Sequence, residues 1–199
     1  MIVKKLIVVL IVVLAFSAQA FAADGYKDEE TGLVFPAELA GFQYWGFHEY
    51  PMPGLGYSVR YNADDTVKVD IYVYDMNHKV IENGIASARV IDQFNTVLGN
   101  LSYYEKKGTY LNLKELERGN KKYGPKGMEF LWARYQFEQS PGEGVVYHGE
   151  RLSDTYLTGW KGKFIKVRLT LKKDAFDQRK ESIEAFMQGL AGILDKSTK

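Results

Sequence analysis

The sequence contains no cysteine, and it has only three histidines and five prolines in 199 residues. Without cysteine the chain cannot form a disulfide, use a thiol nucleophile or carry a lipid on an N-terminal cysteine, so its stability must come from packing. The histidines, His48, His78 and His148, are far apart and lack the short spacings of a metal site that can be recognised from sequence. We therefore expect neither a metal nor another cofactor.

The chain also lacks an excess of charge of either sign. Its 26 lysines and arginines balance 25 aspartates and glutamates, which gives a net charge of +1 at pH 7. Removal of the predicted signal segment, which contains Lys4 and Lys5 and no acidic residue, changes this charge to −1. A nearly neutral chain of mixed charge gives no electrostatic argument for binding nucleic acid or an anionic membrane.

Motifs of nucleophilic and nucleotide-binding enzymes are missing as well. The sequence has no G-x-S-x-G, and Gly54-Leu55-Gly56 lacks the third glycine of a dinucleotide-binding loop. Residues 119–127 are rich in glycine and lysine but lack the closing Gly-Lys-Ser/Thr of a phosphate loop, so we expect a hairpin connection there. A small anion or acidic partner bound by three lysines of this segment is the alternative: Lys121, Lys122 and Lys126.

Paired carboxylates are the remaining enzymatic alternative. Four acidic residues in or beside predicted strands could approach one another across a sheet: Asp70, Asp75, Glu129 and Glu138. Two such groups serve as acid and base in glycoside hydrolysis. Carboxylates on the water-facing side of a strand are ordinary, however, so we assign no catalytic residue.

The N-terminal 22 residues have the pattern of a secretory signal peptide. Lys4 and Lys5 precede an apolar run at residues 6–16, and small residues follow. The apolar run is shorter than the ~20 residues that span a bilayer, and cleavage is expected after Ala20 or Ala22. We therefore expect an exported protein, periplasmic or extracellular, with no membrane span after cleavage.

The remaining sequence predicts a single α+β domain at residues 32–195, between a flexible mature N-terminus at 23–31 and a basic tail at 196–199. Alternation of apolar and polar residues is clearest at residues 67–74. Two amphipathic helices are expected, one opening at Asn83 as its cap and one at Asp174. Strands are expected at residues 39–47, 57–61, 67–74, 109–117, 128–138, 144–153 and 156–172, forming a mostly antiparallel sheet.

Without the short first strand at 39–47, the order of these elements is β-β-α-β-β-β-β-α, which resembles the sandwich shared by the Mog1 and PsbP families. Three segments are also similar to uncharacterised exported bacterial proteins: Leu33-Val34-Phe35-Pro36, Pro53-Gly54-Leu55-Gly56 before Tyr57-Ser58-Val59-Arg60-Tyr61, and Val69-Asp70-Ile71-Tyr72-Val73-Tyr74-Asp75. The resemblance implies a fold, and because members of this fold are mostly binding or accessory proteins, it favours binding over catalysis.

Aromatic residues supply the candidate binding site. Tyr72 and Tyr74 lie on the polar face of their predicted strand, and Trp132 and Arg134 share one face of another. The strand that contains Trp132 is apolar on both faces, so we expect Trp132 to be packed beneath a helix. The alternative, which gives the candidate binding site, is that these four side chains line a groove for a peptide, glycan or lipid, with Met52 and Leu55 at its rim.

Together these features predict an exported, non-enzymatic binding or accessory protein of the bacterial cell envelope. Its partner would be an envelope protein or a small ligand, and nucleic acid is not expected. Two alternatives stay open: an envelope hydrolase built from dispersed carboxylates and His148, and a carrier of a small apolar ligand.

Overall fold

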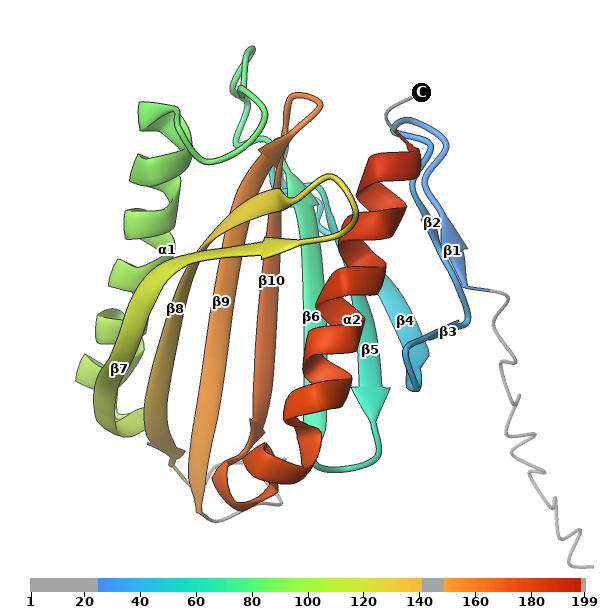
Figure 1. Ribbon diagram of the computed structural model, residues 1–199. Helices are drawn as coiled ribbons and strands as arrows, with labels where there is room; N and C mark the ends of the chain where they lie inside the picture. Colours follow the sequence, from blue (N-terminus) through green and yellow to red (C-terminus); the bar gives the residue numbers. More distant parts are fainter. Residues whose placement is uncertain (1–24, 141–148, 198–199) are drawn as a thin grey trace, which may run out of the picture.

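The computed structural model describes residues 25–140 and 149–197 (Figure 1). The predicted signal peptide, His148 and the last two residues of the basic tail lie outside this part of the chain. The described residues form an α+β structure with a large antiparallel sheet and two long helices, which confirms the predicted fold class.

The large sheet has eight strands in the order β3-β4-β5-β6-β10-β9-β8-β7. Their bounds are β3 (Glu38–Leu39), β4 (Phe42–Glu49), β5 (Tyr57–Ala63), β6 (Val67–Tyr74), β7 (Tyr110–Tyr123), β8 (Met128–Gln139), β9 (Glu150–Trp160) and β10 (Lys163–Lys172). A separate two-stranded sheet pairs β1 (Tyr26–Lys27) with β2 (Val34–Phe35). The helices are α1 (Ala88–Lys106) and α2 (Phe176–Lys196), the latter following the short 3-10 helix η1 (Lys173–Ala175).

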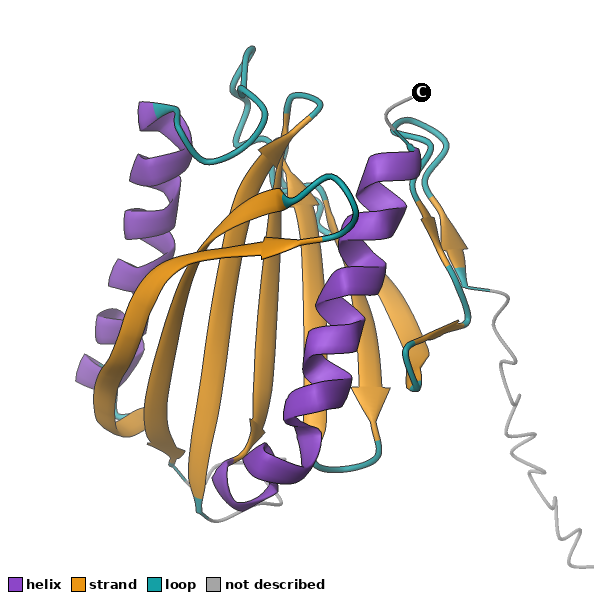
Figure 2. Cartoon of the chain, in the orientation of Figure 1, coloured by secondary structure: helices purple, strands orange, loops and turns teal. Residues whose placement is uncertain are grey.

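The two helices cover opposite faces of the large sheet (Figures 1 and 2). On the α2 face, the apolar residues of β5, β6 and β10 pack against buried side chains of α2 such as Phe186 and Leu190. On the α1 face, Val90, Phe94 and Leu98 of α1 pack against β7, β8 and β9. The predicted alternation in β6 is confirmed, because Val67, Val69, Ile71 and Val73 all belong to the α2-side core.

Helix α1 begins later than the sequence predicted. Ser87 caps it, with its side-chain oxygen accepting from the Val90 N–H at 3.3 Å. The predicted cap, Asn83, instead accepts from the Lys161 N–H at 2.7 Å, and the backbone of Gly84 exchanges hydrogen bonds with Gly159 of β9. Asn83 and Gly84 therefore hydrogen-bond to residues 159–161 and are not available to cap the helix. The expected cap Asp174 lies within η1, and α2 starts without a side-chain cap.

Three strand boundaries also differ from prediction. Strand β7 continues through Gly119 and Asn120, which were expected to form a turn, and the connection to β8 lies at residues 124–127. The single strand predicted at 156–172 is divided by a turn at Lys161 and Gly162 into β9 and β10. Part of the predicted 144–153 strand lies outside the described residues, and the rest begins β9.

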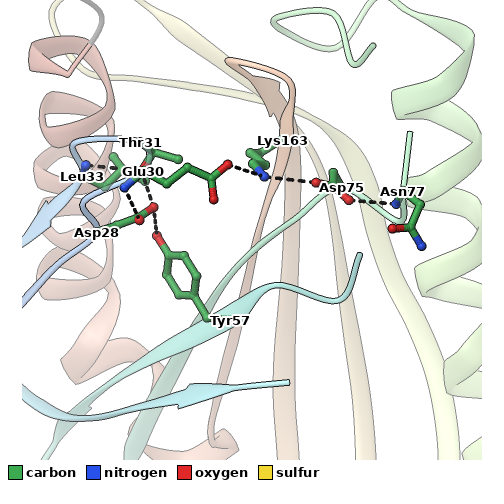
Figure 3. A network of polar contacts seen from close by, with 8 residues as sticks. All are labelled: Asp28, Glu30, Thr31, Leu33, Tyr57, Asp75, Asn77 and Lys163. Carbon is green, nitrogen blue, oxygen red and sulfur yellow. Dashed lines mark hydrogen bonds and ion pairs between the residues drawn. The ribbon is translucent and has the colours of Figure 1, made fainter. Parts of the chain in front are cut away.

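The N-terminal segment 25–31, expected to be flexible, instead attaches to the sheet through β1 and a polar cluster (Figure 3). The buried carboxylate of Asp28 accepts hydrogen bonds from the hydroxyls of Thr31 and, at 2.9 Å, Tyr57. Lys163 then bridges Glu30 and Asp75, each at 3.0 Å, which joins this segment to β10 and to the end of β6. Burial alone would raise the pKa of Asp28, but these hydrogen bonds outweigh it and lower that pKa below its usual value.

Replacement of Asp28 should therefore weaken the fold in a pH-dependent way. We expect Asp28→Ala to lower the free energy of unfolding by about 1–3 kcal/mol at pH 7, because two hydroxyl donors lose a charged acceptor. The Asp28 pKa is lowered by folding, so this stabilisation is present above the unfolded-state pKa and is lost as the pH falls through the folded-state pKa. Denaturant titrations at pH 7 and pH 3 measure it. The control Lys27→Ala removes an exposed ion pair and should change stability by less than ~1 kcal/mol. Equal losses for the two variants would contradict the role given to Asp28.

Candidate functional site

One surface of the large sheet has a polar and aromatic lining. We call it the open face: it is formed by the side chains of β4, β5, β6 and β10 that point to the α1 side, beyond the strands that α1 covers. The strand pairing arranges these side chains in three cross-strand rows. From β5 through β6 to β10, the rows are Ser58-Tyr72-Lys166, Arg60-Asp70-Arg168 and Asn62-Lys68-Thr170.

The middle row has an ion pair at its centre. Asp70 is only 4% exposed, and its carboxylate contacts Arg60 Nε at 2.6 Å and Lys68 Nζ at 3.8 Å. A buried carboxylate needs such partners, because desolvation without them costs several kcal/mol. In these rows the one carboxylate of Asp70 faces the cations Arg60, Lys68, Lys166 and Arg168, so the described part of the open face has a local excess of positive charge.

Lys166 occupies a small cavity at one end of the open face. The cavity has a volume of about 220 Å³ and is lined by Tyr50, Leu55, Tyr72, Tyr74 and Lys166. Lys166 Nζ lies 3.7 Å from the centroid of the Tyr72 ring, a cation–π contact. Desolvation, reinforced by the neighbouring charge of Arg168, lowers the pKa of Lys166 to about 8, although Asp70 acts in the opposite direction.

The walls of this cavity come from the 50–56 loop and from strands β6 and β10. Gly56 has a φ of +58°, and a Cβ there would lie 2.0 Å from the Val73 carbonyl oxygen, so only glycine lets the 50–56 loop approach β6 this closely. That approach places Leu55 beside Tyr72. On the other side, Tyr74 accepts a hydrogen bond from Gln93 of α1 at 3.0 Å.

Trp45 marks the opposite part of the open face. The β4–β5 register shifts between Tyr44 and Gly46, and the bulge leaves the Trp45 side chain 70% exposed. Two shallow hollows of about 430 and 480 Å³ meet at this ring, one beside Lys68 and the other beside Arg60. Both hollows have acidic as well as basic side chains in their linings, Asp64 and Asp65 beside Lys68 in one and Asp70 beside Arg60 in the other. An exposed tryptophan between two hollows is typical of a binding surface rather than of packing.

The structure brings together only some of the predicted site residues. Tyr72, Tyr74 and Leu55 line the Lys166 cavity, whereas Met52 is 64% exposed in the same loop and does not line it. Trp132 and Arg134 lie on the opposite, α2 face of the sheet. The groove considered as the alternative for these six residues is therefore not formed.

Trp132 is a core residue, as the two apolar faces of its strand predicted. It is 2% exposed, its ring lies 4.2 Å from Lys121 Nζ, and its Nε1 has no hydrogen-bond acceptor among the described residues. Arg134 lies over the ring of Phe176 in α2 and pairs with the buried carboxylate of Asp154 through two contacts of 2.7 Å. These residues border a cavity of about 250 Å³ beneath α2, separate from the open face.

The residues considered for other chemistry have partners in different places. Asp75 contacts Lys163, Glu129 contacts Lys122, and Glu138 accepts from Asn112, so the carboxylates considered for hydrolysis do not form a described pair. In the glycine-rich segment, Lys121 covers Trp132 and Lys126 donates to the Asp195 carbonyl oxygen. Within residues 25–140 and 149–197, no group of His, Asp and Glu side chains could hold a metal ion.

Sequence reasoning missed several residues of the open face, among them Trp45, Tyr50, Arg60, Lys166 and Arg168. Lys166 and Arg168 alternate with apolar residues, a pattern that is usual for a strand with one face in water. A signal was present in the β6 and β10 segments together, because most of their polar positions hold a cation or a tyrosine: Lys68, Tyr72 and Tyr74 in β6, and Lys166 and Arg168 in β10.

Comparison with known proteins gives similarity of fold. No protein-family model matches the chain, and no curated protein matches it. The solution structure of cyanobacterial PsbP from Synechocystis sp. PCC 6803 is similar with a TM-score of 0.48 and 12% identity, covering 82% of this chain and 88% of that chain. The crystal structure of PA94, a Pseudomonas aeruginosa protein of unknown function, has a TM-score of 0.40 and 12% identity, covering 82% and 92%. Both similarities concern the fold alone.

Neither α1 nor α2, the long helices of the described residues, is both long and apolar enough to cross a membrane.

The burial of Trp132 leads to a stability prediction. We expect Trp132→Ala to lower the free energy of unfolding by about 3–5 kcal/mol, because it removes a large core side chain beneath α2. Chemical denaturation monitored by circular dichroism measures the change. Trp45→Ala, which removes an exposed ring, is the matched control and should change stability by less than ~1 kcal/mol. Similar values for the two variants would contradict the assignment of Trp132 to the core.

The partly buried charge of Lys166 should lower the free energy of unfolding. Because its folded-state pKa of about 8 lies below the ordinary lysine pKa of 10.5, the unfolded chain binds more protons between these values, and stability rises with pH across that interval. We expect Lys166→Met to be more stable than the parent by about 1–3 kcal/mol at pH 7, with the difference shrinking from pH 8 to pH 10.

Urea titrations at pH 7, 8.5 and 10 test this expectation. Lys114→Met, an exposed substitution on β7, is the control and should change stability by less than ~0.5 kcal/mol at each pH. A destabilised Lys166→Met variant at pH 7 would show that Lys166 contributes to the fold instead of being tolerated by it.

Proposed function

We propose that the chain is an exported, non-enzymatic binding protein of the bacterial cell envelope, and that its open face binds an acidic segment of a partner protein. The single observation that carries the proposal is the excess of cations on this face beside an exposed tryptophan. The signal-peptide pattern at residues 1–22 supports the location.

Charge and ring content favour a protein partner. The mature chain has a net charge close to zero, so the cations of the open face create a local field that selects a complementary acidic patch. Arginine, tryptophan and tyrosine are the residues that dominate protein interfaces, since they offer large contact areas at a small entropic cost. Arg60, Trp45 and Tyr50 supply all three around one hollow.

Binding also fits the surroundings of the acidic groups better than catalysis does. Asp70 is neutralised by Arg60 and Lys68, and Asp75 by Lys163, so neither carboxylate is arranged as a general base or a nucleophile. These ion pairs stabilise the sheet and leave the positive charge on its surface.

A crosslinking capture experiment tests the proposal. The mature protein, residues 23–199, is incubated with an envelope extract, and crosslinked peptides are identified by mass spectrometry. We expect an acidic segment of one envelope protein crosslinked to residues around Lys68, with recovery falling at least tenfold for Trp45→Ala and for Lys68→Glu.

Tyr103→Ala is the matched control, because Tyr103 is an exposed aromatic residue on α1, away from the open face. It should capture the same protein as the parent. Equal recovery by the parent, Trp45→Ala and Lys68→Glu, or crosslinks that map elsewhere on the sheet, would overturn the proposal.

A further inference from the structure

The large sheet ends in two edge strands, and the β7 edge is protected against pairing with another strand. The Leu113 N–H donates to the Glu105 carboxylate of α1 at 3.2 Å, and the β7–β8 register shifts twice. Charged side chains follow along the rest of this strand: Lys114, Glu115, Glu117, Arg118, Lys121 and Lys122. Bulges, charges and a covering helix are the means by which natural sheets keep an edge from pairing with another chain.

The opposite edge lacks this protection along the second half of β4. Strand β3 pairs only with Phe42 and Gln43, and the Tyr44 N–H donates to the Ala37 carbonyl oxygen at 2.8 Å. After the bulge, residues 46–49 pair with β5 on one side and with no strand of the described chain on the other. Such an edge offers free backbone donors and acceptors to a further strand.

One hydrogen bond shows which of these backbone groups face outward. The Tyr50 N–H donates to the Gly56 carbonyl oxygen at 2.9 Å, on the β5 side. Backbone groups of successive residues in an antiparallel strand point to opposite edges, so His48 also faces β5, whereas Phe47 and Glu49 face away from it. Among residues 25–140 and 149–197, no group outside the β4–β5 ladder hydrogen-bonds to the backbone of Phe47 or Glu49.

The two sides of this edge have different chemistry. On the open face, Gly46 has open space where a side chain would stand, and it pairs with Arg60, whose side chain is 43% exposed beyond its bond to Asp70. An acidic residue beside Gly46 would therefore lie near a cation. On the α2 side, the Phe47 ring stacks on Tyr26 with 4.2 Å between centroids and stays 39% exposed. An apolar residue beside Phe47 would cover the exposed part of that ring.

We propose that the acidic segment of the partner binds as an added strand along the outer edge of β4, and that acidic and apolar residues alternate in it. Its apolar residues lie beside Phe47 and exchange backbone hydrogen bonds with Phe47 and Glu49, and its acidic residues lie on the open face near Arg60. The inference rests on the proposed function, since it gives the conformation and sequence pattern of the same partner segment. In complexes of this kind, backbone hydrogen bonds supply affinity and alternate side chains supply specificity.

Titration of the purified mature protein with synthetic peptides tests the added strand. The probe is an acetylated and amidated hexapeptide in which glutamate and valine alternate, and chemical shifts of ¹⁵N-labelled backbone amides report where it binds. One analogue is N-methylated at its valines, which removes the N–H groups that would face β4. The matched analogue is N-methylated at its glutamates, which removes the N–H groups that would face away. We expect the probe and the glutamate-methylated analogue to shift the amides of Phe47 and Glu49, and the valine-methylated analogue to bind at least tenfold more weakly.

Two substitutions at one position test the same hydrogen bond from the side of the protein. Glu49→Pro removes an outward N–H and keeps Trp45, Phe47 and Arg60, and proline is tolerated on an edge strand where the missing N–H faces solvent. We expect it to weaken binding of the probe at least tenfold. Glu49→Ala, which keeps the N–H, should bind the probe no more than twofold more weakly than the parent. The two methylated peptides provide the test if Glu49→Pro does not fold.

Three results would overturn the added strand: no binding of the probe, equal binding of the two methylated analogues, or equal loss with Glu49→Pro and Glu49→Ala. A dimer of the protein that Glu49→Pro dissociates would assign this edge to a second copy of the chain and would also overturn it. Capture of an acidic envelope segment together with any of these results would keep the proposed function and remove the strand. Binding of the probe at β4 without capture of a partner would support the strand-pairing edge and count against the proposed function.

Discussion

The width of the large sheet is the constraint on which the rest of the structure depends. Eight strands spaced ~4.8 Å apart make a sheet about 34 Å wide, whereas an α-helix with its side chains is about 10 Å across. One helix on each face cannot cover such a sheet. On the α2 face the remaining area is packed by aromatic residues of the β1–β2 segment, such as Tyr26 and Phe35. On the α1 face it is left to water, and the side chains there are polar.

This uncovered area explains the chemistry of the open face. A charged side chain among exposed neighbours stays hydrated. A charged side chain among half-buried neighbours loses hydration and needs an ion-pair partner, as Asp70 has in Arg60. Lys166 departs from this rule, because it is half-buried without a carboxylate partner among the described residues. Departures of this kind, in which local stability is given up, are expected where a surface binds something else.

The sequence predicted the elements well and the site poorly, for one physical reason. Alternation tells which residues of a strand share a side, so the buried set of β6 was predicted correctly from Val67 to Val73. It does not tell which face of the whole sheet that side belongs to. The groove considered as an alternative contained both Tyr72 and Trp132, but strand pairing puts them on opposite faces.

Helix caps and turns were also predicted incorrectly from the local sequence. Asn83 has the chemistry of a helix cap, and Gly119-Asn120 has that of a turn, yet each is used otherwise in the folded chain. Asn83 binds the turn after β9, and Gly119-Asn120 continues β7 opposite β8. Contacts between segments distant in sequence override these local preferences, and a single sequence gives no signal of such contacts.

The pairing of β6 with β10 has a consequence for how the molecule folds. Strands β3–β6 follow one another through hairpins, as do β7–β10, so each group is assembled from contacts that are near in sequence. Within the large sheet the two groups join along the β6–β10 pairing, from Val67 with Leu171, 104 positions apart, to Tyr74 with Phe164, 90 positions apart. Closing so long a loop costs entropy before any burial repays it. The cooperative step in folding is therefore the meeting of these two meanders, and the Asp70–Arg168 row crosses the boundary between them.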